Sequence, residues 1–241
     1  MTSQVLACTA PERVTVGTDD SYWGTRALSW GTEHARLRGA QLQVLHPATD
    51  NPVAALADAS ATSDLVVLGC RGHRHRLLGL GAALPTVAAA HCDVLVVRGT
   101  VAAQRGENRC VTAMVSGGLD DMTVVQHAAA MATSHHARME VVHAQPPTAL
   151  DDDVFVEKLR IETLRLRTTV TTVRTLPHEV IATSDGSDLI VLGRSHSPGR
   201  PSSPGVVTKA ALHHAPCPVL VVHPARPAVR RSRIAGQGGM A

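Results

Sequence analysis

The sequence presents one series of short motifs twice, and the spacing between the copies identifies a duplicated domain. Residues 64–69 (DLVVLG) return at 188–193 (DLIVLG), 124 positions later, and residues 92–97 (CDVLVV) return at 217–222 (CPVLVV), 125 positions later. A repeat of this length is a domain-sized unit and not one turn of a solenoid. The 241 residues therefore predict two related domains, each of ordinary size.

The two copies differ in length. Residues 35–46 match residues 132–143 at a separation of only 97 positions, so the second copy contains 27 residues that the first lacks. That difference is about the length of one helix plus one strand. We therefore expect four strands in the first half and five in the second.

Each half alternates short β-branched runs with Ala-rich segments, which is typical of parallel βαβ units. The runs at 65–69 and 189–193 are wholly apolar, as expected for strands that helices cover on both faces. We predict strands at 13–17, 41–46, 65–69 and 94–97, and then at 110–115, 139–143, 170–176, 189–193 and 219–222. Predicted helices cover 21–38, 52–62, 84–91, 121–136, 152–167 and 177–184.

Composition excludes several classes of function. Single-stranded nucleic acid is bound by stacking on aromatic rings, and aromatics make up only 2% of this chain. The net charge of +3 belongs to residues 224–241, which hold four arginines and no acid, and the rest carries −1. We therefore predict no nucleic-acid partner. The five cysteines form no CxxC pair, which favours reduced thiols in the cytoplasm, and no apolar run reaches the length of a membrane span.

Two segments resemble the universal stress protein (UspA) family in its tandem, two-domain form. Residues 211–222 (ALHHAPCPVLVV) are similar to its last helix and strand, and residues 32–46 are similar to its first helix and second strand. The similarity extends over 13–223. It implies an α/β fold of two Rossmann-like domains, of the adenine nucleotide alpha hydrolase-like type, with the family's strand order 3-2-1-4-5 and with about one helix and one strand lacking in the first domain.

We accordingly place a truncated universal stress protein domain at 11–99, a second domain at 109–223, and a basic disordered tail at 224–241. In this family, domains pair through their last strands. The resemblance therefore implies an internal pseudo-dimer with residues 94–97 and 219–222 at the interface, where pairing covers two exposed edges. It also allows a homodimer.

Some members of the family hold ATP with a pattern of Gly, two residues, Gly, nine residues and Gly-Ser/Thr, because phosphates approach bare backbone amides. The first half keeps Gly69 and Gly72, but Gly81 comes one residue early and Ala82 replaces the hydroxyl. Asp19 matches the acidic residue that lies beside the nucleotide. The resemblance thus implies cofactor-binding residues Asp19, Gly69, Gly72 and Gly81, with ATP binding that is weak or lost.

The second half departs further from the pattern. His196 replaces the second glycine, Val206 replaces the hydroxyl, and Ser116 replaces the acid, so we expect no nucleotide there. In the first half, the basic loop at 71–76 (RGHRHR) either binds a phosphate or is a solvated loop. No metal site is predicted, because the histidine pairs 135–136 and 213–214 are adjacent and point in different directions on a helix.

Residues 116–120 (SGGLD) provide an alternative of another class. Between a strand and a helix, they resemble the pyrophosphate loop SGGxDS of N-type ATP pyrophosphatases. The final Ser is Asp121 here, and its charge opposes a bound pyrophosphate by roughly 4 kcal/mol per charge pair. The simpler interpretation is that Gly117 and Gly118 form the turn between strand and helix.

Three hypotheses follow from the sequence. The one we favour is a non-enzymatic regulatory or stress-response binding module, cytoplasmic, with at most weak ATP binding in its first domain. The second is an ATP-using enzyme built on the loop from Ser116 to Asp120. The third is a pure interaction scaffold that binds no ligand.

Overall fold

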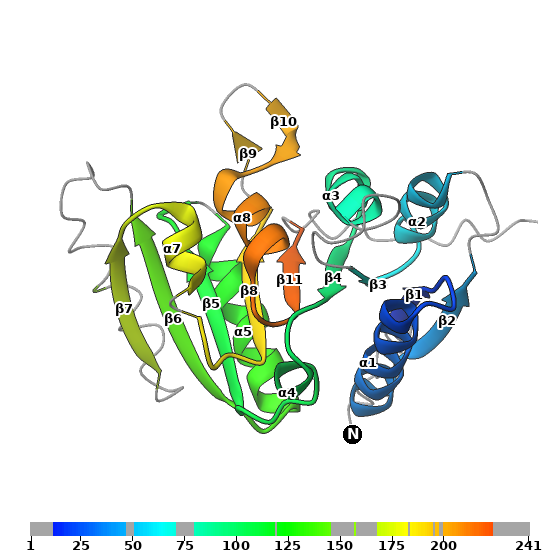
Figure 1. Ribbon diagram of the computed structural model, residues 1–241, viewed down its shortest axis with the longest axis horizontal. Coiled ribbons are helices and arrows are strands. Elements are labelled where there is room, and N and C mark those ends of the chain that lie inside the picture. Colours follow the sequence, from blue (N-terminus) through cyan, green and yellow to red (C-terminus); the bar gives the residue numbers. More distant parts are fainter. Residues whose placement is uncertain are drawn as a thin grey trace, which may run out of the picture.

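The fold is organised around a single nine-stranded sheet with helices on both faces (Figure 1). A computed structural model describes residues 12–46, 51–70, 80–118, 120–145, 157, 168–182, 184–194, 196–197 and 200–223. The strand order is β2-β1-β3-β4-β11-β8-β5-β6-β7. This confirms the predicted α/β class with Rossmann-like connections.

The first half contributes four parallel strands. Its elements are β1 (Arg13–Gly17), α1 (Tyr22–Arg38), β2 (Gln41–Leu45), α2 (Pro52–Ser60), β3 (Leu65–Gly69), α3 (Leu80–Ala89) and β4 (Asp93–Val97). The order β2-β1-β3-β4 lacks a strand beyond β2 among the described residues. The shorter repeat spacing in the first half therefore corresponds to a missing outer strand, as predicted.

The second half contributes five parallel strands in the order β7-β6-β5-β8-β11, which is the 3-2-1-4-5 arrangement. After a short α4 (Val101–Gln104), its elements are β5 (Cys110–Val115), α5 (Asp121–Ser134), β6 (Arg138–Gln145), β7 (Thr169–Arg174), α7 (Pro177–Ala182), β8 (Leu189–Gly193), α8 (Val206–His214) and β11 (Val219–Val222). The helix predicted at 152–167 lies outside the described residues except for Glu157, which is helical. The sequence did not predict the hairpin of β9 (His196–Ser197) and β10 (Arg200–Pro204).

The halves are joined by antiparallel pairing of their last strands, β4 and β11. Val96 pairs with Val219, and Val94 pairs with Val221. The predicted interface of the internal pseudo-dimer is thereby confirmed. Each of these strands would otherwise be an exposed sheet edge, and the pairing covers both.

Equivalent side chains make the same buried contacts in the two halves. The hydroxyl groups of Thr15 and Ser63 lie 2.7 Å apart, and those of Thr112 and Ser187 also lie 2.7 Å apart. Each pair ties the first strand of its half to the turn before the strand that lies next to it, β3 in the first half and β8 in the second. The recurrence of a polar contact, and not only of an apolar pattern, supports descent of both halves from one unit.

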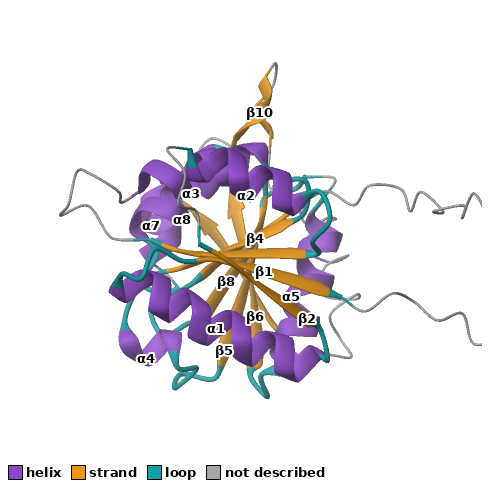
Figure 2. Cartoon of the chain, turned by 90° about the vertical axis from the view of Figure 1, so that its right-hand side faces the viewer, coloured by secondary structure: helices purple, strands orange, loops and turns teal. Residues whose placement is uncertain are grey.

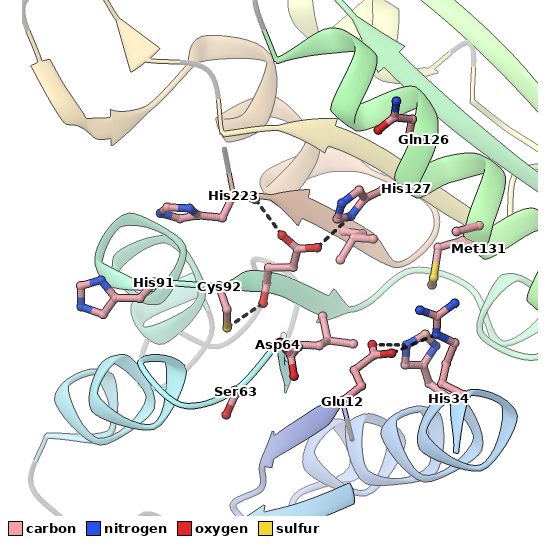
Figure 3. A pocket seen from close by; sticks show the side chains of 15 residues that line it. Glu12, His34, Ser63, Asp64, His91, Cys92, Gln126, His127, Met131 and His223 are labelled. Carbon is pink, nitrogen blue, oxygen red and sulfur yellow. Dashed lines mark hydrogen bonds and ion pairs between the residues drawn. The ribbon is translucent and has the colours of Figure 1, made fainter. Parts of the chain in front are cut away.

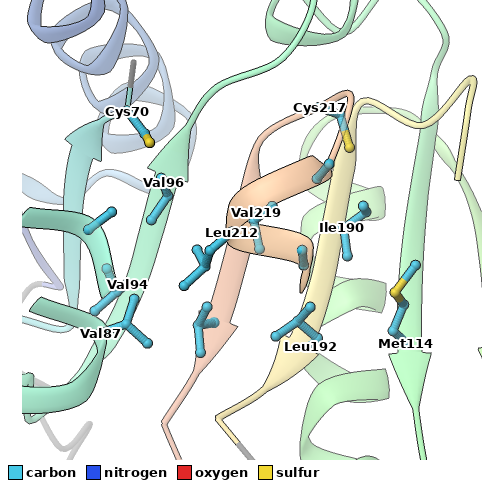
Figure 4. Close-up of a cluster of buried hydrophobic side chains, with 14 of the residues drawn as sticks. Cys70, Val87, Val94, Val96, Met114, Ile190, Leu192, Leu212, Cys217 and Val219 are labelled. Carbon is cyan, nitrogen blue, oxygen red and sulfur yellow. The ribbon is translucent and has the colours of Figure 1, made fainter. Parts of the chain in front are cut away.

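Both hydrophobic layers continue through the junction of the halves. One layer lies under α1 and α5 and contains Leu95 of β4 and Leu220 of β11. The other lies under α2, α3, α7 and α8, where Val94 and Val96 share a cluster with Val219 (Figure 4). Figure 2 shows helices above and below the sheet. The two halves thus form one packed body.

Two buried arginines also connect the halves. Arg98, which follows β4, donates to the carbonyl oxygens of Ala211, Leu212 and His213 at the end of α8. Arg194, which follows β8, donates from Nη1 to Ala90 O at 3.2 Å, just after α3. Helix C-termini carry unpaired carbonyls and a partial negative charge. Each guanidinium donates hydrogen bonds to such carbonyls and places a positive charge beside them.

Candidate functional site

The carboxyl ends of β1 and β3 form the first candidate site. In open parallel sheets, ligands bind beyond the strand ends where the strand order reverses, and β1 and β3 lie at that point in the first half. Asp19 follows β1 by two residues and is exposed. Its Oδ1 accepts hydrogen bonds from the backbone N of Ser21 at 3.2 Å and from Ser21 Oγ at 2.5 Å. Asp19 is therefore held at the start of α1.

Gly69, the last residue of β3, is required by helix packing. A Cβ atom on Gly69 would overlap the backbone carbonyl of Trp23 in α1. The first turn of α1 thus lies directly against the end of β3. The sequence attributed this glycine to phosphate binding, whereas the structure gives it a packing role that needs no ligand.

The other two predicted residues lie farther along the chain. Gly81 is the second residue of α3, which begins at Leu80, four positions before the predicted start. Its place is therefore in the first turn of a helix and not in the preceding loop. Gly72 and the basic loop 71–76 lie outside the described residues. Asp19 and Gly69 are the two predicted residues that the structure places at neighbouring strand ends.

At the equivalent place in the second half lies a cavity with a volume of about 650 Å³. It opens between the carboxyl ends of β5, β6 and β8 and the first residues of α5, α7 and α8. Most of its wall is apolar. The lining side chains include Met114, Leu176, Pro177, Val180, Leu192, Val206 and Val207. The sequence predicted no nucleotide site in this half because the glycines of the motif are lost. The two valines at the start of α8 are the feature of the sequence that could have indicated an apolar cavity.

The loop 116–118 at this cavity binds a carboxylate of its own chain. Asp121 Oδ2 accepts hydrogen bonds from the backbone N of Ser116 at 2.9 Å, Gly117 at 2.7 Å and Gly118 at 2.9 Å. Asp121 is only 6% exposed. Burial raises its pKa, and the three amide hydrogen bonds oppose that rise. The amides that would hold a pyrophosphate in an SGGxDS loop are therefore occupied.

Another cavity, of about 590 Å³, lies where the two halves meet (Figure 3). His127 of α5 pairs with Asp93 at the start of β4, with Nδ1 and Oδ2 separated by 2.9 Å. The other oxygen of Asp93 accepts from the backbone N of His223 at 2.9 Å. The hydrogen bond that His127 donates to Asp93 raises the pKa of His127. This carboxylate therefore fastens two segments of the second half to the first.

The described residues contain no group of three His, Cys, Asp or Glu side chains close enough to hold a metal ion. None of the described helices combines the length and apolar character that crossing a bilayer demands. The four described cysteines, Cys70, Cys92, Cys110 and Cys217, are thiols. Burial raises the pKa of Cys92 and of Cys217 to about 12, so neither is a reactive thiolate near neutral pH.

The arrangement of paired Rossmann-like units joined through their last strands is the fold of universal stress proteins. The chain is similar to a universal stress protein from Archaeoglobus fulgidus DSM 4304, with a TM-score of 0.70 and 14% identity over 88% of this chain and 96% of that one. A universal stress protein of Pseudomonas aeruginosa UCBPP-PA14 gives a TM-score of 0.67 and 15% identity, over 89% and 94% of the two chains.

A protein of unknown function from Pseudomonas aeruginosa PAO1 is similar as well, with a TM-score of 0.66 and 15% identity over 89% of this chain and 93% of that one. At these identities the likeness establishes the fold. No protein-family model matches the sequence, and no curated protein matches it at a significant level.

Proposed function

We propose that this protein is a non-enzymatic, cytoplasmic regulatory module of the universal stress type, with at most weak ATP binding in its first half. The observation that carries the proposal is the fused pair of units, each with a reversal of strand order, because open parallel sheets bind ligands beyond the strand ends at such a reversal. In the first half, Asp19 and the end of β3 at Gly69 supply the predicted nucleotide contacts, with Gly72 and Gly81 completing the set.

Two features support weak binding. Among the described residues no strand lies beyond β2, and Leu42 and Val44 of β2 are 38% and 40% exposed, so this side of the predicted nucleotide site has no further wall. Ala82 stands where a hydroxyl would donate to a phosphate. Phosphate contacts alone would then have to hold the nucleotide against competition from water.

The occupied loop at 116–118 supports a protein without ATP chemistry. An ATP pyrophosphatase loop needs its backbone amides for the pyrophosphate. Here they donate to Asp121, whose negative charge also repels an incoming phosphate. We therefore do not propose the enzyme that the motif resembles.

The proposal is tested by following the melting temperature during titration with ATP up to millimolar concentration. A stabilisation of about 1 kcal/mol requires ligand at roughly five times its dissociation constant. We expect a small, saturable rise that Asp19→Ala and Gly72→Val abolish. Ser116→Ala, the change at the equivalent position of the second half, is the matched control and should leave the rise intact.

The same titration separates the alternatives. Release of pyrophosphate would refute the non-enzymatic proposal. A melting temperature that ATP leaves unchanged at every concentration would favour the interaction scaffold. A rise that Ser116→Ala removes and Asp19→Ala does not would place the nucleotide in the second half, against the proposal.

A further inference from the structure

The cavity of the second half has the opposite electrostatic character to a phosphate site. Its charged lining residues are Asp120 and Asp121, and the described lining contains no Lys, Arg or His. A nucleotide would bring further negative charge to these two carboxylates. A positively charged ligand would be attracted by both.

The hydrogen-bond donors around the cavity are largely committed within the protein. Three amides of the loop 116–118 donate to Asp121. The hydroxyl of Thr208, in the first turn of α8, donates to Gly193 O at 3.0 Å. The backbone N of Gly205, which precedes α8, donates to Arg194 O at 3.1 Å. The groups that would usually coordinate a phosphate here already have partners.

Asp120 is the carboxylate that a ligand can engage. It occupies the N-cap position of α5, yet its side chain makes no capping hydrogen bond. In the described part of the chain, no ion pair or side-chain hydrogen bond involves its carboxylate. Asp120 is half-buried at the edge of an apolar cavity, where the charge is less screened than on the open surface.

We infer that this cavity binds an organic cation, with an ammonium group at Asp120 and an apolar body against the walls formed by Leu176, Val180, Leu192 and Val207. The volume of about 650 Å³ accommodates a body of two or more rings. This inference goes beyond the proposed function, which concerns the first half, and it assigns the second half a ligand of different charge.

Three probes with the same two-ring body test the inference: naphthylmethylamine, naphthylmethanol and naphthoate. They carry a positive, a neutral and a negative head group, so their affinities isolate the charge preference. By calorimetry, we expect the amine to bind about tenfold more tightly than the alcohol, as one charge-assisted contact predicts. Naphthoate should not bind.

Two substitutions locate the site. Asp120→Asn keeps the shape of the side chain and should reduce the affinity for the amine to that for the alcohol. Asp58→Asn, on an exposed face of α2 in the other half, is the matched control and should change nothing. Val206 is 60% exposed at the cavity, so Val206→Arg should fold normally, weaken the amine and admit naphthoate.

Several outcomes would overturn the inference. These are equal affinities for the three probes, tightest binding of naphthoate, no binding of any probe, or amine binding that Asp120→Asn leaves unchanged. The result is separable from the ATP titration, because that depends on Asp19 in the other half. Either proposal can fail while the other holds.

Discussion

His34 is a buried imidazole whose protonation should oppose folding. It lies in α1 and is 3% exposed, and its ring belongs to a cluster with Trp30, at 5.1 Å between ring centroids, and His135, at 6.1 Å. Its Nδ1 has no hydrogen-bond partner among the described residues. Glu12 Oε1 is 3.9 Å from Nε2, and Arg38 lies nearby. Burial, reinforced by the charges of His135 and Arg38, lowers the pKa of His34 from 6.5 to about 4.

The magnitude follows from the difference between the folded and unfolded states. Between about pH 6.5 and pH 4, the unfolded chain binds a proton at His34 and the folded chain does not. The free energy of unfolding therefore falls as the pH is lowered through this window. At pH 5 the loss amounts to about 2 kcal/mol relative to neutral pH, since each pKa unit corresponds to roughly 1.4 kcal/mol.

Urea unfolding at pH 7.5 and pH 5.0 measures this loss. Met131 occupies the equivalent position in α5, so His34→Met is the replacement that the repeat itself suggests. We expect the variant to lose about 2 kcal/mol less than the wild type between the two pH values. His178→Met, at an exposed position of α7, should behave as the wild type does. Equal losses in wild type and His34→Met would refute the reasoning.

Three further predictions test other contacts. Asp93→Asn should destabilise the protein by up to about 1 kcal/mol near pH 6 and by less at pH 8.5. Because Asp93 raises the pKa of His127, the stabilisation by this pair is present at low pH and is lost as the pH rises through the pKa of His127 in the folded protein. Equal effects of Asp93→Asn at both pH values would contradict this prediction. Asp121→Ala removes the shared acceptor of three part-buried amides and should cost about 2 kcal/mol, partly restored by phosphate in thermal unfolding. No response to phosphate would argue against an anion-binding loop. Gly69→Ala should cost about 2–3 kcal/mol through its clash with Trp23, whereas Gly118→Ala has space and should be nearly neutral in urea unfolding.

The sheet was predictable because its signals are local and repeated. The wholly apolar runs that became β3 and β8 mark strands buried on both faces, and the difference in repeat spacing located the missing outer strand. The pairing of β4 with β11 followed from the resemblance to tandem domains. In each case a pattern of residue types is enough, because burial on both faces tolerates few alternatives.

Other elements were hidden by their composition. The structure starts α3 at Leu80 although Gly79, Gly81 and Pro85 favour a loop, and the helix continues through Pro85. The strands β9 and β10 consist largely of Ser and Pro residues, which usually indicate a turn. Tertiary packing outweighs local propensity at such places.

The candidate sites depend on side-chain geometry that the sequence does not carry. The sequence placed a carboxylate at position 121 and predicted repulsion of pyrophosphate. Only the structure shows that one oxygen of this carboxylate accepts hydrogen bonds from three amides of the preceding loop. Similarly, Gly69 matched a ligand motif, but the closeness of Trp23 supplies a separate reason for a glycine.

Fusion of the two halves has an evolutionary consequence. In an assembly of identical chains, a substitution that removes ligand binding alters every copy of the site at once. Here β4 and β11 join unlike copies within one polypeptide, and each copy buries the other's edge whatever its own cleft contains. One cleft is then free to change its ligand, or to lose it, without leaving its neighbour unsupported.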